Sequence, residues 1–189
     1  MDLVVFAHPE SKISHNAVIL DYVRAYLERK KRQYRVIDLY KDGFDPVLRL
    51  VDESHGVAGY GDDVRRYQAM ISESERVVFI YPVWWYNMPA IMKGFIDRIF
   101  TSGFAFEYKL DGGWNLTRPK LTGKKAVIIN TFGHGERLYK EYGGSTDKVL
   151  DDTVLGFCGM KTVRVNWFDI HQPSSIPESV REQIDKALE

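Results

Sequence analysis

The stretch Arg76 to Phe106, RVVFIYPVWWYNMPAIMKGFIDRIFTSGFAF, decides the fold. Residues 76–81 form a short apolar run rich in β-branched and aromatic side chains, which predicts a buried strand. Residues 90–100 have apolar side chains at helical spacing, which predicts a helix. The loop between them carries three consecutive aromatic residues between two prolines. A strand, a loop and a helix in this order are typical of the carboxyl end of a parallel strand, where open α/β sheets bind their ligands.

Apolar patterns on either side extend this arrangement. They predict further strands at residues 3–7, 34–39, 125–130 and 161–167. Helical spacing predicts further helices at residues 18–27, 64–73, 146–157 and 177–188. We expect Ser14 or Asn16 to cap the first of these helices, Gly159 to follow the end of the third, and Pro177 to lie in the first turn of the last.

The alternation of strands and helices predicts an α/β fold. We expect one domain over residues 1–189, built on a doubly wound five-stranded parallel sheet with helices on both faces. The strand order 2-1-3-4-5 fits this number of strands. Residues 101–123 contain several glycines and little periodicity, so they are expected to form an excursion from the sheet.

Charge balance and cysteine content exclude several classes of protein. The 26 basic and 26 acidic residues cancel, so the overall charge does not indicate nucleic acid or an anionic membrane as a partner. The basic run at residues 29–32 ends a predicted helix, where cations compensate the helix dipole. The single cysteine, Cys158, excludes an internal disulfide and a multi-cysteine metal site. Without a basic leader or an apolar run of about 18 residues, we expect a cytoplasmic protein with no membrane span.

In the predicted sheet, the loops after strands one, three and four meet at one edge. The first loop, residues 8–16, combines His8, Ser11 and Ser14 with a helix N-terminus, which favours phosphate binding. Neither G-x-G-x-x-G nor G-x-x-x-x-G-K-[ST] is present, so the Rossmann and P-loop fingerprints are absent. The alternative is that Ser14 is only a helix cap and His8 only a strand-end histidine.

The other two loops favour a planar ligand. Residues 82–87 offer aromatic faces and backbone amides, although these aromatics are also compatible with a core or a dimer contact. Residues 131–135 offer two glycines for close backbone approach, together with Thr131 and His134. Tyr139 and Tyr142 follow as hydroxyl donors, with surface tyrosines as the alternative. The three loops together suit flavin mononucleotide.

The chain resembles the NAD(P)H:quinone oxidoreductase family of flavodoxin-like flavoproteins. This family includes DT-diaphorase-like enzymes and ancillary subunits of bacterial potassium efflux systems. The resemblance covers almost the whole chain, and its middle block is the most specific part. The blocks that carry it are Ala7-His8-Pro9, Ser14-His15-Asn16, residues 81–90, Lys93-Gly94-Phe95-Ile96-Asp97-Arg98, residues 103–106 and residues 131–135.

The resemblance implies a homodimeric flavoprotein enzyme. It would hold FMN, with FAD as an alternative, take a hydride from NADPH or NADH, and pass two electrons to a quinone-like acceptor in a ping-pong cycle. The resemblance assigns the phosphate end to His8, Ser14 and Asn16, the ring to Pro82, Val83, Trp84, Trp85 and Tyr86, and the ring's polar edge to Thr131, Gly133 and Gly135. The sequence has no counterpart of the long C-terminal extension of the larger animal enzymes, which weakens the transfer of FAD specificity from the resemblance.

The resemblance also implies catalytic residues and a dimer surface. Tyr139 matches a tyrosine near the flavin. Some members pair it with a histidine at the position that Ser145 occupies here, so His134 is the candidate substitute. The aromatic excursion at residues 100–114 would suit the subunit interface.

Three other functions compete with this interpretation. Cys158 and Arg164 have the C-x5-R spacing of a cysteine phosphatase loop, but the predicted order of helix, cysteine and strand is the reverse of that site. A flavin-binding regulatory subunit, peripherally associated with a cation transporter, would share the fold and turn over little substrate. A one-electron flavodoxin is disfavoured by the aromatic excursion and by the lack of an acidic surface excess.

Overall fold

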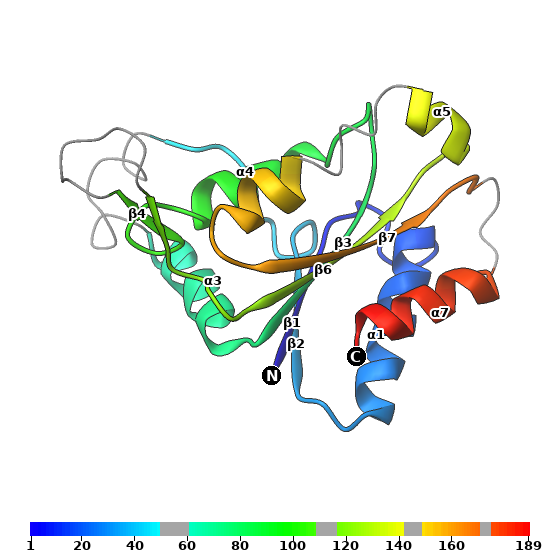
Figure 1. The fold of residues 1–189 in the computed structure, drawn as a ribbon, viewed down its shortest axis with the longest axis horizontal. Helices are drawn as coiled ribbons and strands as arrows, with labels where there is room; N and C mark the ends of the chain where they lie inside the picture. Colours follow the sequence, from blue (N-terminus) through cyan, green and yellow to red (C-terminus); the bar gives the residue numbers. More distant parts are fainter. Residues whose placement is uncertain (50–60, 109–116, 142–148, 171–174) are drawn as a thin grey trace.

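The computed structural model describes residues 1–49, 61–108, 117–141, 149–170 and 175–189. A five-stranded sheet forms its centre (Figure 1). Its strand order is β2-β1-β3-β6-β7 and every pairing is parallel, which confirms the predicted doubly wound order. The strands are β1 (Asp2–Phe6), β2 (Tyr34–Asp38), β3 (Arg76–Pro82), β6 (Lys125–Thr131) and β7 (Lys161–Trp167).

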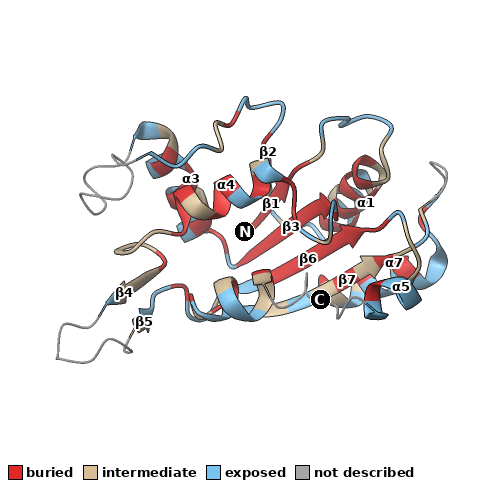
Figure 2. Cartoon of the chain, turned by 90° about the horizontal axis from the view of Figure 1, so that it is seen from above, coloured by how far each residue is buried: buried red, intermediate tan, exposed pale blue. Residues whose placement is uncertain are grey.

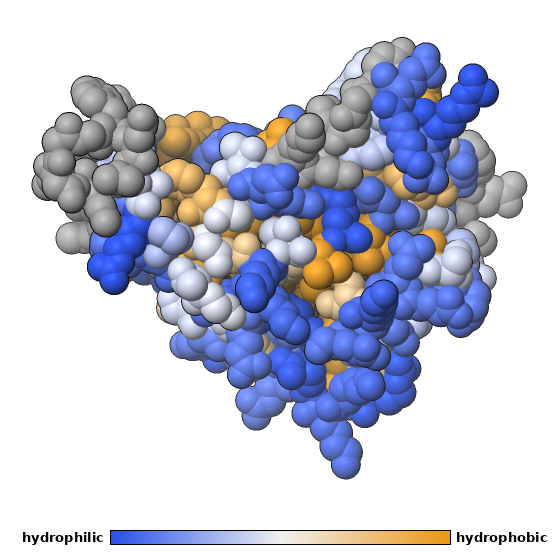
Figure 3. All heavy atoms as spheres, in the orientation of Figure 1, coloured by the Kyte–Doolittle hydropathy of each residue, from blue (hydrophilic) through white to orange (hydrophobic). Residues whose placement is uncertain are grey.

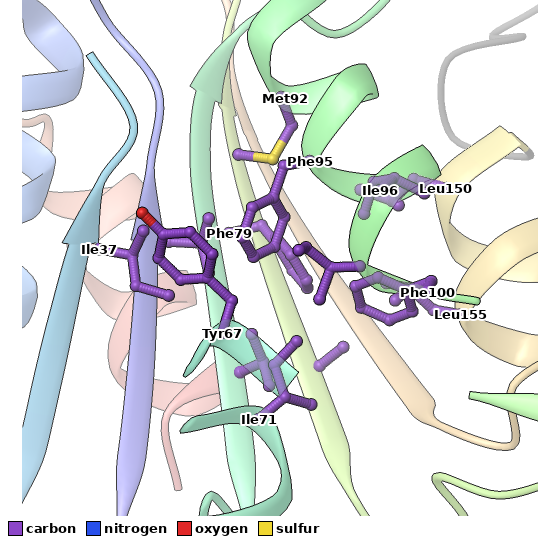
Figure 4. Close-up of a cluster of buried hydrophobic side chains, with 14 of the residues drawn as sticks. Ile37, Tyr67, Ile71, Phe79, Met92, Phe95, Ile96, Phe100, Leu150 and Leu155 are labelled. Carbon is purple, nitrogen blue, oxygen red and sulfur yellow. The ribbon is translucent and has the colours of Figure 1, made fainter. Parts of the chain in front are cut away.

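Helices cover both faces of the sheet. Helices α1 (His15–Arg29) and α7 (Glu178–Ala187) pack on one face, through side chains such as Ile19 and Ile184. Helices α3 (Asp62–Glu73) and α4 (Ala90–Ile99) pack on the other, where Tyr67, Phe79 and Phe95 are buried (Figure 4). Successive side chains of β1, β3 and β6 point to opposite faces, so these central strands are buried almost throughout (Figure 2).

The structure adds short elements that the sequence patterns did not indicate. A two-stranded antiparallel hairpin, β4 (Phe106–Tyr108) and β5 (Thr117–Pro119), lies within the predicted excursion. A short helix, α5 (Glu136–Glu141), follows the loop after β6. Within the helix predicted at residues 146–157, the described part is a π-helix, η2 (Val149–Gly156). The predictions that concern Tyr142, Ser145 and residues 109–114 lie outside the described residues.

Helix boundaries follow the expected chemistry in most places. Ser14 caps α1, and its Oγ accepts a hydrogen bond from the Ala17 amide at 3.1 Å. Gly159 has φ 89°, the left-handed conformation that glycine adopts most readily, and it leads from η2 into β7. Pro177 is the N-cap of α7, one position before the predicted one. Within the described ranges, no helix has the length and apolar character needed to cross a bilayer.

Candidate functional site

The three loops selected from the sequence lie at the carboxyl edge of β1, β3 and β6, which are neighbouring strands. Strand order reverses between β1 and β3, and such a switch point is where doubly wound sheets bind ligands. A cavity of about 370 Å³ opens at this edge. It is lined by Pro82, Val83, Trp84, Trp85, Thr131, Gly133, His134 and Ile170. Its volume lies in the range of small-molecule sites, roughly 300–1,000 Å³.

The aromatic loop forms a tight two-residue turn. Trp84 and Asn87 exchange backbone hydrogen bonds, with N···O distances of 2.9 and 3.0 Å. Between them, Trp85 has φ 52° and Tyr86 has φ 56°, so both lie in the left-handed region as in a type I′ turn. Large side chains rarely adopt this conformation, and such strain is concentrated at functional sites. The turn leaves Trp85 98% exposed.

Ring contacts join this turn to the other two loops. The His8 and Trp84 ring centroids are 6.0 Å apart, which links the first loop to the second. The Tyr86 and His134 centroids are 5.0 Å apart, with an interplanar angle of 32°, which links the second loop to the third. His134 lines the cavity, whereas Tyr86 packs against His134 and is not itself a lining residue.

His8 occupies a half-buried position in the first loop. Its Nδ1 lies 3.0 Å from the Glu10 amide nitrogen and 2.9 Å from the Glu10 carbonyl oxygen. A neutral ring therefore accepts the amide hydrogen, whereas a protonated ring donates to the carbonyl. Burial lowers the pKa of His8 below its ordinary value, although the Glu10 carbonyl opposes this effect. Burial therefore favours the neutral imidazole of His8 when no ligand anion lies beside it.

Asn16 fastens the first loop to the third. It is buried, and its Oδ1 accepts a hydrogen bond from the Thr131 hydroxyl at 2.8 Å. Its Nδ2 is also buried and has no hydrogen-bond partner among the described residues. A buried donor without an acceptor is costly, by about 1–3 kcal/mol. An acceptor oxygen supplied by a ligand would remove that cost.

The two glycines of the third loop play different roles. A Cβ atom built on Gly133 would meet nothing within 4 Å, so the cavity wall is open at this residue. A Cβ on Gly135 would lie 3.2 Å from both carboxylate oxygens of Asp169, so this glycine permits close packing of the loop after β7. Gly133 lines the cavity and Gly135 does not.

Tyr139 lies behind the cavity wall. It is 5% exposed and packs in a small aromatic cluster with Phe132 and Phe168. Its ring centroid is 5.0 Å from that of Phe132 and 5.4 Å from that of Phe168. The sequence reasoning missed Phe168 and Ile170, which follow β7. The carboxyl end of the fifth strand reaches the same edge of the sheet, and this was the signal that could have found them.

The geometry does not support cysteine phosphatase chemistry. Cys158 is buried, and burial raises the pKa of its thiol to about 11, so it is not a reactive thiolate at neutral pH. Arg164 instead binds Asp151 and Asn130. Among the described residues, no group of three His, Cys, Asp or Glu side chains is arranged to hold a metal ion.

A second cavity, of about 460 Å³, lies beside β7 and α7. Its lining includes Arg164, Asn166, Trp167 and Gln183. This cavity borders the last strand of the sheet and not the switch between β1 and β3, so we assign the candidate site to the smaller cavity.

The parallel sheet order and the cavity at its β1–β3 switch define a flavodoxin-like α/β protein. A family model described as a flavodoxin-like fold matches residues 3–189. An uncharacterized NAD(P)H oxidoreductase of Haemophilus influenzae is 30% identical over 175 residues, which cover 89% of this chain and 84% of that relative. A ribosyldihydronicotinamide dehydrogenase [quinone] of Mus musculus is 30% identical over 186 residues, covering 85% of this chain and 78% of the relative.

A solved structure of a quinone oxidoreductase is also similar to this chain. The NAD(P)H:quinone oxidoreductase from Methanothermobacter marburgensis superimposes with a TM-score of 0.76 at 26% identity, covering 98% of this chain and 92% of that chain. The chain therefore belongs to the NAD(P)H:quinone oxidoreductase family with the flavodoxin-like fold, which confirms the resemblance found in the sequence.

Proposed function

We propose that the protein is a flavin-dependent NAD(P)H oxidoreductase. It would hold FMN, with FAD as the alternative, and pass two electrons from NADPH or NADH to a quinone-like acceptor in a ping-pong cycle. The names of its relatives support the nicotinamide donor and the quinone acceptor. The cavity at the β1–β3 switch carries the proposal, because it combines flat aromatic faces with an open backbone wall.

The first loop fits the phosphate end of the cofactor. The backbone amides at the start of α1 favour an anion, as helix N-termini generally do. Ser14 and His8 add polar groups beside them, and the unpaired Nδ2 of Asn16 lacks an acceptor that a cofactor oxygen would supply. We assign the binding of this end to these three side chains.

The second and third loops fit the planar ring. Trp84 and Trp85 line the cavity with aromatic side chains, and Gly133 leaves space where any other residue would place a Cβ. Pro82, Val83 and Thr131 complete the wall between them. When bound, the flavin would supply the hydride-transfer chemistry, while the protein orients it and excludes water.

We assign proton exchange at this site to His134. A quinone needs two electrons and two protons to become a hydroquinone, and a hydride brings both electrons but only one of the protons. His134 lines the cavity and carries an exchangeable imidazole proton, so it can supply the second. Tyr139 is buried behind Phe132, so we assign it to support of the wall, and direct catalysis by its hydroxyl stays a prediction.

We also infer a homodimer. Trp85 is 98% exposed although it borders the cavity, and a second subunit would cover this face and close the site. Light scattering during size-exclusion chromatography tests this inference: a monomeric mass at micromolar concentration would contradict it. A cytoplasmic location and association with a transporter stay predictions.

The cofactor proposal is tested by purifying the protein, recording its visible absorbance and identifying any released flavin by mass. We expect a yellow protein, or one that binds added FMN and then oxidises NADPH in the presence of menadione. A colourless protein that neither FMN nor FAD reconstitutes would overturn the proposal.

The variant Gly133→Ala tests whether the flavin ring binds in this cavity. Its new methyl group meets no protein atom within 4 Å, so the free energy of unfolding should stay within about 0.5 kcal/mol of the unmodified value. The same methyl group occupies the open wall, so FMN binding should weaken roughly tenfold or more. Unchanged FMN affinity would show that the ring binds elsewhere.

A further inference from the structure

Arg164 is a buried arginine that the proposed chemistry does not use. It lies on β7, and its side chain is only 8% exposed. Its Nε donates to Asp151 Oδ2 at 3.0 Å, and its Nη2 binds the second oxygen of the same carboxylate. Its Nη1 donates to Asn130 Oδ1. One guanidinium group therefore contacts residues from two other elements, η2 and β6.

Asn130 carries this contact to the floor of the candidate site. Its Nδ2 donates to the Tyr81 carbonyl oxygen at 3.1 Å, and the two residues are register partners on β6 and β3. Each is followed directly by a residue that lines the cavity: Pro82 follows Tyr81, and Thr131 follows Asn130. Arg164 holds the amide oxygen of Asn130, so it orients the amide nitrogen toward Tyr81.

Asn130 and Asp151 stand at the two ends of the connection from β6 to η2. This connection carries Gly133 and His134, which line the cavity, and Tyr139, which packs behind it. We propose that Arg164 is a positioning residue: it clamps both ends of this connection and so sets the geometry of the cavity wall. Its consequence for flavin binding rests on the proposed function.

The energetics favour a positioning role over a stabilising one. Taking both charges of a buried ion pair out of water offsets most of their attraction, so replacing such a pair with apolar residues is often neutral for stability. The planar fork of arginine, however, fixes two partners at once in a way that the point charge of lysine does not. We therefore expect the clamp to matter for geometry more than for the stability of the fold.

The test compares a paired apolar replacement with a matched control. Asp151→Leu with Arg164→Met removes both charges together, so the fold and its melting temperature should be largely retained. The control is Asp63→Leu with Arg98→Met, because Arg98 on α4 is likewise a buried arginine, 7% exposed, whose Nη2 lies 3.0 Å from a carboxylate oxygen of Asp63 on α3. The single variant Arg164→Lys keeps the charge and loses the fork, and it replaces the paired variant if that variant does not fold.

Two measurements follow. Amide hydrogen exchange over residues 132–141, with no flavin present, should be faster in the clamp variant and unchanged in the control. The clamp variant should bind FMN roughly tenfold more weakly. The visible circular dichroism of the bound flavin should also change, because a misplaced cavity wall disturbs the ring.

Protein that binds no flavin even when unmodified would refute the proposed function, and the exchange measurement would still test the clamp. Unchanged exchange in residues 132–141 of the clamp variant would overturn the inference.

Discussion

Trp85 and Tyr86 adopt a backbone conformation that suits glycine. A left-handed conformation costs an ordinary residue about 1–2 kcal/mol, and the tight turn between Trp84 and Asn87 requires it twice. In this conformation the turn places the Trp85 side chain at the edge of the cavity. Strain of this kind is retained where it serves a site, at the expense of stability.

We therefore predict that Trp85→Gly stabilises the fold and weakens FMN binding. The free energy of unfolding in urea should rise by up to about 1 kcal/mol. Glycine relieves the backbone strain, and the conformational entropy that glycine loses on folding offsets part of this stabilisation. FMN affinity should fall with the loss of the aromatic face. Lys31→Gly is the matched control: Lys31 has φ 52° and is exposed far from the loops, so it should gain stability with no change in FMN affinity. A Trp85→Gly variant that binds FMN normally would contradict the assigned role.

His8 should make stability depend on pH. Burial lowers its pKa in the folded protein, so the unfolded chain binds the proton more readily and protonation favours unfolding. Its contribution to stability is therefore complete above the ordinary value of 6.5 and is lost as pH falls below it. The difference in unfolding free energy between the unmodified protein and His8→Gln, measured in urea from pH 8 to pH 5, should shrink toward acid. A constant difference would show that His8 is not the group responsible.

Bound FMN should reverse this trend. A phosphate beside His8 favours the protonated imidazole, so FMN binding should tighten as pH falls from 8 toward 6. Because His8→Gln removes the titrating group, its FMN affinity should vary less over the same range. Equal pH dependence in both proteins would place the phosphate away from His8.

At the scale of elements, α4 depends on one glycine for its position. A Cβ on Gly94 would lie 2.2 Å from the Pro46 carbonyl oxygen and 2.5 Å from the Pro46 Cα atom. Only glycine lets the segment around Pro46 pack this closely on the helix. Nearby, Arg98 donates to the Asp45 carbonyl at 2.7 Å and completes the attachment of that segment.

Gly94→Ala should therefore destabilise the protein by about 1–3 kcal/mol, because backbone atoms on both sides must move apart. Chemical denaturation measures the loss, and Gly133→Ala serves as the control because its added methyl group meets no protein atom. Equal stability in both alanine variants would show that residues 45–47 do not pack on α4 as described.

Long apolar runs made the sheet predictable from the sequence, whereas the short elements were not predicted. The central strands β1, β3 and β6 are buried on both faces and have nearly continuous apolar sequences, and alternation with helices then limits the possible topologies. The hairpin strands β4 and β5 have three residues each, too few to show a period. In residues 149–156 the buried residues are Leu150 and Leu155, and two positions are too few to distinguish the wider turn of a π-helix from that of an α-helix.

The candidate site was predictable only as far as strand ends reveal it. Strand order alone brought Trp84 together with Thr131 and His134, which belong to a loop far from Trp84 in the sequence. The left-handed turn, the unpaired Asn16 amide and the burial of Tyr139 depend on side-chain packing. No spacing rule encodes that packing, so these features needed the structure.

At the scale of the whole molecule, the two edges of the sheet have different tasks. The carboxyl edge carries the candidate site, and the amino edge carries a buried ion network. Asp2, fully buried on β1, accepts hydrogen bonds from Arg76 at 2.7 Å and from Arg32 at 2.5 Å. Arg76 also donates to the Leu188 carbonyl, so the network ties the end of α7 to the sheet. Most of the surface in the view of Figure 3 is hydrophilic, with apolar atoms near its middle, where the edge strand β7 crosses.

Asp2→Asn should separate stability from ligand binding. Removing the carboxylate leaves two arginines without their shared anion, one of them buried, so the free energy of unfolding should fall by about 3 kcal/mol. Asp62→Asn is the matched control, because Asp62 forms an exposed pair with Arg65 and should change stability by less than about 1 kcal/mol. Urea denaturation measures both changes.

FMN affinity at a temperature where each variant is folded should be the same in both variants, since the network lies at the edge opposite the cavity. A loss of FMN affinity in Asp2→Asn without loss of stability would mean that the two edges are coupled through the strands, and the division of tasks between them would be wrong.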